Sequence, residues 1–82
     1  MPKTYITREA EQSARLSAWI YGQMKLKDIP QWKLAEERGI TQSALNRKLK
    51  LNSYSFDDFA FFIRFFEGTV ADMAWIAGAK GE

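Results

Sequence analysis

The segment Gln31–Lys50, QWKLAEERGITQSALNRKLK, decides the fold that this sequence predicts. It reads as two short helices, one over residues 31–38 and one ending at Lys50, with Gly39 and Ile40 between them. A glycine directly after a helix can adopt the left-handed backbone that ends the helix without steric cost. Thr41 then offers its side-chain oxygen, as a cap, to the free N–H groups of the second helix. A helix, a short turn with glycine and a second helix are typical of a helix-turn-helix.

The second helix of this segment has two chemically different faces, because successive side chains are about 100° apart around an α-helix. Ala44, Leu45, Leu49 and the aliphatic stem of Lys48 share one face. The opposite side, called the polar face below, carries Gln42, Ser43, Asn46, Arg47 and Lys50. These amide, hydroxyl and cationic groups suit base edges, since arginine pairs with guanine and glutamine or asparagine with adenine. A solvated helix face beside a core is the alternative interpretation.

The segment resembles the lambda-repressor-like helix-turn-helix family, the phage repressor, Cro and XRE-type group of DNA-binding proteins. The resemblance rests on Gln31, Ala35, Gly39, Ile40, Gln42, Ser43 and Leu45. It implies an all-α, compact five-helix domain with the helix-turn-helix at about residues 31–50, whose second helix reads operator DNA in the major groove. The family usually has its next apolar residue three positions after Leu45, where this chain has Lys48. Because Leu49 follows instead, it stays open whether Arg47 or Lys50 points most directly into the groove.

The predicted DNA contacts form two groups, one that reads bases and one that holds phosphates. We assign base contacts to Gln42, Ser43, Asn46 and Arg47. We assign phosphate contacts to Gln31, Thr41, Lys50, Asn52 and Ser53. The resemblance implies a phosphate contact for Gln31, and it places the loop 52–53 along the sugar-phosphate backbone. For Gln31, a polar residue that merely begins a helix is an equal alternative.

The remaining chain predicts a single domain over residues 8–77, between a flexible N-terminal arm (1–7) and a frayed C-terminal tail (78–82). The first helix should begin near residue 8 and continue to about residue 25. Its i, i+4, i+8 stripe of Leu16, Ile20 and Met24, with Trp19 alongside, indicates core residues.

A fourth helix is predicted over residues 56–67, and it holds all six phenylalanines. Ser55 and Asp58 have the spacing of a capping box at its start. One face is predicted to join the core: Phe59, Phe62, Ile63 and Phe66. Gly68 should end this helix, and Thr69 with Asp72 should open a fifth helix over 70–77. Its expected core residues are Val70, Met73 and Ala77.

Four apolar residues have no place in this predicted core: Phe61, Phe65, Trp75 and Ile76. A paired exposed aromatic face suggests a partner surface. We therefore expect these residues to form a homodimer contact, as the resemblance also implies, because relatives often dimerise through their C-terminal helices. The alternative is that Phe61 or Phe65 tucks under the first helix.

Composition bounds the possible chemistry. The 82 residues include no cysteine and no histidine, which excludes disulfides, thiolate metal sites and Cys- or His-based catalysis. Because glycine-rich phosphate loops and metal-ligand spacings are also missing, we expect no enzyme, no metal and no cofactor. No apolar run approaches the ~18 residues of a membrane span, and the N-terminus lacks the apolar core of a signal peptide. We therefore expect a cytoplasmic protein without a membrane partner.

Charge is distributed unevenly along the chain. Residues 25–50 hold seven basic and three acidic side chains, whereas residues 53–82 hold two basic and five acidic ones. A basic half that contains the motif suits a polyanionic partner. Together with the polar face, this charge distribution predicts a protein that binds double-stranded DNA. The resemblance implies a sequence-specific regulator that binds an operator, as a phage-type repressor in a bacterial or phage-infected cell. The alternative is a protein-interaction module, antirepressor- or antitoxin-like, that uses the Phe-rich fourth helix.

Overall fold

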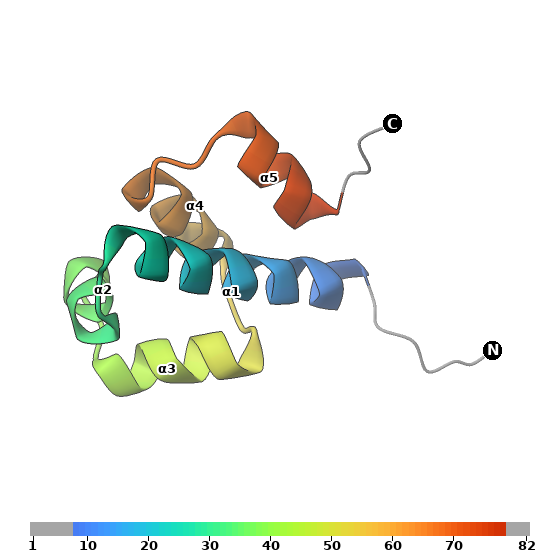
Figure 1. The fold of residues 1–82 in the computed structure, drawn as a ribbon. Helices are drawn as coiled ribbons and strands as arrows, with labels where there is room; N and C mark the ends of the chain where they lie inside the picture. Colours follow the sequence, from blue (N-terminus) through green and yellow to red (C-terminus); the bar gives the residue numbers. More distant parts are fainter. Residues whose placement is uncertain (1–7, 79–82) are drawn as a thin grey trace.

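The chain folds into helices, and the last three each begin at a side-chain cap present in the sequence. The computed structural model describes residues 8–78, which form five α-helices and no β-strand. The helices are α1 (Arg8–Lys27), α2 (Gln31–Arg38), α3 (Gln42–Leu51), α4 (Phe56–Phe65) and α5 (Val70–Ala77) (Figure 1). The predicted arm 1–7 and residues 79–82 of the predicted tail lie outside the described part. Among the described helices, none is long and apolar enough to cross a membrane.

Short-range hydrogen bonds fix the helix ends, as the sequence predicted. Gly39 ends α2 with φ of 83°, and the Thr41 hydroxyl accepts a 3.0 Å hydrogen bond from the N–H of Ala44. Asn52 ends α3 in the left-handed conformation, with φ of 52°. Two capping boxes, Ser55 with Asp58 and Thr69 with Asp72, open α4 and α5. The turn between α2 and α3 is therefore set locally.

The long α1 lies between two groups of helices. Figure 1 shows α2 and α3 on one side of it and α5 on the other, with α4 behind. α2 packs against α3, and α1 packs against α5. Two side chains of α1 bind the end of α5. Gln12 donates to the carbonyl of Ala77 at 2.9 Å, and Arg15 donates to the carbonyl of Trp75 at 3.1 Å.

Every helix contributes to one hydrophobic core. Its buried members are Leu16, Trp19, Ile20, Met24, Leu34, Ala35, Leu45, Leu49, Phe62, Phe66 and Ile76. The predicted stripe of α1 is confirmed, and so is the burial of Leu45 and Leu49 on the predicted apolar face of α3. Phe59 and Ile63 are only partly buried, at the edge of this core.

The predicted core face of α5 is wrong. Val70 is 78% exposed and Ala77 is also exposed, whereas Ile76 is buried. Met73 is half-buried. The helix is turned so that Ile76 enters the core, and this orientation buries more apolar surface than one that would bury Ala77.

The end of α4 also differs from the prediction. The helix ends at Phe65, and Glu67, rather than Gly68, takes the left-handed conformation with φ of 56°. A Cβ atom on Gly68 would come within 3.2 Å of Trp19 and Ile63 side-chain atoms. Close packing, not backbone conformation, therefore favours a glycine at this position. α1 likewise continues to Lys27, beyond the predicted residue 25.

Candidate functional site

The α3 helix presents the predicted polar face to solvent. All five of its residues are exposed: Gln42, Ser43, Asn46, Arg47 and Lys50. On the opposite side, Leu45 and Leu49 are buried in the core. α3 contains no acidic residue, so no carboxylate of its own neutralises this face. The predicted division of α3 into an apolar side and a polar side is confirmed.

A surface depression of about 500 Å³ continues from the polar face to the loop after α3. Its lining consists of Ser43, Ala44, Arg47, Lys48, Leu51 and Ser53. Leu51, one residue beyond the predicted end of the helix, is an exposed apolar side chain here. Hydroxyl, cationic and aliphatic groups thus meet in one concave surface.

The residues predicted to contact phosphates lie at helix ends. Gln31 is the first residue of α2 and is half-buried, and Pro30 before it makes no side-chain cap to the free N–H groups. Thr41 is exposed, although its Oγ1 atom is occupied by the N–H of Ala44. Lys50 and Ser53 are exposed near the other end of α3. Thr41 and Ser53 therefore flank α3 at its two ends, and Lys50 belongs to the polar face itself.

Asn52 instead points toward α1, in an arrangement that the sequence did not predict. Its Oδ1 atom accepts a 2.6 Å hydrogen bond from the hydroxyl of Ser17, which also contacts the hydroxyl of Tyr54. Burial raises the pKa of Tyr54 to about 12, although the Ser17 hydrogen bond opposes this rise. The only sequence signal was a serine between Leu16 and Ile20 on the apolar stripe of α1. Asn52 thus makes a hydrogen bond inside the protein, which its predicted role as a phosphate contact does not explain.

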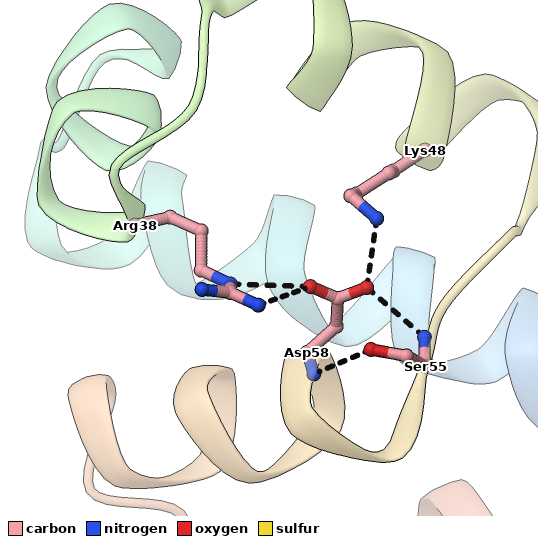
Figure 2. A network of polar contacts seen from close by, with 4 residues as sticks. All are labelled: Arg38, Lys48, Ser55 and Asp58. Atoms are coloured by element: carbon pink, nitrogen blue, oxygen red, sulfur yellow. Dashed lines mark hydrogen bonds and ion pairs between the residues drawn. The ribbon is translucent and has the colours of Figure 1, made fainter.

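The buried carboxylate of Asp58, in α4, binds side chains of α2 and α3 and so links the three helices. Asp58 accepts hydrogen bonds from Arg38, at 2.9 and 3.1 Å, and from the ammonium of Lys48, at 2.8 Å. Its Oδ2 atom also accepts from the backbone N–H of Ser55 at 3.0 Å. Figure 2 shows these four residues, the Asp58 cluster, converging from three helices and the loop before α4. The cluster fixes α3 relative to α4.

The Asp58 carboxylate is ionised far below neutral pH. Burial alone would raise its pKa, but the hydrogen bonds from Lys48, Ser55 and Arg38 outweigh burial and lower the pKa from 3.8 to about 2. The sequence predicted Asp58 only as half of a capping box. The signal for its second role was Lys48, a cation at the position where the family resemblance expects an apolar residue.

The four predicted dimer residues do not form one exposed patch. Ile76 is a core residue, so the assignment of its side chain to a partner contact is wrong. Phe61 and Phe65 stack on each other with ring centroids 5.5 Å apart, and both pack partly buried against the core. Trp75 is 47% exposed, with the guanidinium of Arg15 above its ring. Of the four, Trp75 is the most available to a partner.

Residues 8–78 contain no group of three acidic side chains that could hold a metal ion. The candidate site is the exposed polar face of α3 together with Thr41 and Ser53 at the two ends of that helix. Comparisons of the chain with models of protein families, with curated proteins and with solved structures gave no match.

Proposed function

We propose that this protein is a sequence-specific regulator of transcription that binds double-stranded DNA and inserts α3 into the major groove. In this proposal the five helices form a lambda-repressor-like domain, and α2 with α3 is its helix-turn-helix. The mode of action is that of a phage-type repressor, which occupies an operator.

One observation carries the proposal. The polar face combines two amides, a hydroxyl and two cations on one exposed side of a helix whose other side is buried. The major groove presents donors, acceptors and methyl groups that these side chains can pair with. A helix in the groove also requires groups that hold the DNA backbone. In this proposal Gln31, Thr41, Lys50 and Ser53 take that role.

Binding selection from a random duplex library tests the function directly. We expect enrichment of one preferred sequence, bound far more tightly than random duplex and with an affinity that falls as salt concentration rises. The same titration with Arg47→Ala should lose about 1–3 kcal/mol and relax the preference at one base pair. Arg64→Ala, which removes an exposed arginine of α4, is the matched control and should leave binding unchanged. No enrichment would contradict the proposal.

A second candidate function is a protein-interaction module, and one feature favours it. A depression of about 530 Å³ between α1, α4 and α5 is lined mainly by apolar side chains, among them Leu16, Phe59 and Ile76. Phe56, at its margin, is 80% exposed. If the selection enriches no duplex while the protein captures one stoichiometric protein partner, this second function replaces the first.

A further inference from the structure

Lys48 belongs to the most basic stretch of α3, yet its charge is turned away from the polar face. Its neighbours Arg47 and Lys50 are exposed, whereas only 29% of the Lys48 side chain is exposed. The ammonium lies 2.8 Å from Oδ2 of Asp58, as Figure 2 shows. The stem of Lys48 nevertheless lines the depression beside Arg47. A released Lys48 could therefore place its ammonium at the same surface as Arg47.

The Asp58 carboxylate holds a second cation in the same way. Arg38 donates through both Nε and Nη2 to Oδ1, and its side chain is 27% exposed. The side chain of Asp58 itself is 1% exposed. Removing either cation to a distant phosphate would leave a buried carboxylate with incomplete compensation, which is costly. The two cations are thus tied to the protein interior.

We propose that Asp58 sets the selectivity of DNA binding, because it withholds Lys48 from the DNA backbone while it fixes α3 against α4. This inference rests on the proposed function and deepens it. Each cation that neutralises a phosphate strengthens binding to every sequence equally. A carboxylate that removes a cation from this contact lowers affinity for random DNA, and the preferred sequence keeps its base contacts. Asp58 is a positioning residue that acts through Lys48.

The decisive experiment compares two lysines of α3 that are two residues apart. Salt titrations of binding to the preferred duplex and to a random duplex are recorded for the wild type, Lys48→Met and Lys50→Met. Loss of a phosphate contact should reduce the slope of log affinity against log salt by about 0.9. We expect this reduction for Lys50→Met, and we expect Lys48→Met to keep the wild-type slope. Equal reductions for both variants would overturn the inference.

Asp58→Asn tests the same inference by removing the negative charge that holds Lys48. We expect a steeper salt slope, tighter binding to random duplex and a smaller ratio of preferred to random affinity. Adding Lys48→Met to this variant should return the slope toward the wild-type value. A folded Asp58→Asn protein with unchanged slope and ratio would overturn the inference. If circular dichroism shows that Asp58→Asn is unfolded, the lysine pair alone decides.

Failure of this inference is distinguishable from failure of the proposed function. If the wild type prefers no duplex, the regulator function fails. If the wild type has a preferred duplex and Lys48→Met behaves as Lys50→Met does, the function stands and the role of Asp58 fails.

Discussion

The hydroxyl of Ser17 in α1 lies 2.6 Å from Oδ1 of Asn52, the left-handed residue at the end of α3. The same hydroxyl lies 3.3 Å from the carbonyl oxygen of Leu49 and contacts the hydroxyl of Tyr54. A single buried polar group on α1 therefore contacts both the last turn of α3 and the loop that follows it. Together with the Asp58 cluster, it determines how α3 is held on the domain.

Ser17→Ala should lower the free energy of unfolding by about 1–3 kcal/mol, because Asn52 and Tyr54 would keep polar atoms without their buried partner. Urea denaturation followed by circular dichroism measures this change. Ser53→Ala is the control, since that serine is exposed, and it should change stability by less than about 0.5 kcal/mol. Similar losses of stability in both variants would show that the hydrogen bonds of Ser17 contribute no more to stability than an exposed serine does.

Replacement by alanine should change the stability of the protein in opposite directions at two glycines. A Cβ atom would meet nothing within 4 Å at either Gly22 or Gly39, so the backbone alone decides. Gly22 lies inside α1, where alanine should stabilise the protein by about 0.5–1 kcal/mol. Gly39 has φ of 83°, so alanine at this position should destabilise the protein by about 1–2 kcal/mol. Thermal denaturation of both variants checks the signs, and the same sign for both would contradict the described turn.

Acid should weaken the fold through Asp58. Its pKa is lowered from 3.8 to about 2 in the folded protein, so protonation favours the unfolded chain. The stabilisation is therefore complete above the ordinary pKa, and it is lost as the pH falls through about 2. The shift corresponds to about 2 kcal/mol. Urea titrations between about pH 5 and about pH 2 should show this loss in the wild type. A folded Asp58→Asn variant should lack it, and parallel losses in both proteins would contradict the assignment.

Self-association, if it uses α5, should depend on Trp75. We expect sedimentation velocity to show a dimer at micromolar concentrations and Trp75→Ala to weaken it. Trp32→Ala removes a comparably exposed tryptophan on α2 and should leave the association unchanged. A wild-type monomer at high micromolar concentration would exclude the homodimer.

The sequence predicted those parts of the fold that depend on neighbouring residues. Thr41, Ser55 and Thr69 each cap a helix through a residue three positions later, so their roles follow from local spacing. The exposure of the polar face follows from helical periodicity, since Leu45 and Leu49 fix which side is buried. These features needed no knowledge of the other helices.

Contacts between distant segments were not predictable in the same way. The Arg38–Asp58 pair spans 20 residues and the Ser17–Asn52 pair spans 35, and nothing local selects either partner. The predicted rotation of α5 was wrong for the same reason, because α5 packs against α1, which is far away in the sequence. The predicted core had no position for Phe61 and Phe65. In the structure both side chains pack, partly buried, against the core.

The hydrogen bonds from Gln12 to Ala77 and from Arg15 to Trp75 span 65 and 60 residues. Closing so long a loop carries a large entropic cost, whereas the turn between α2 and α3 closes a short one. We therefore expect α2 and α3 to associate early in folding and α5 to dock onto α1 late. Substitutions in α5 should then accelerate unfolding and hardly slow refolding in stopped-flow measurements. In a newly made chain, the polar face would be assembled before the last helix closes the domain.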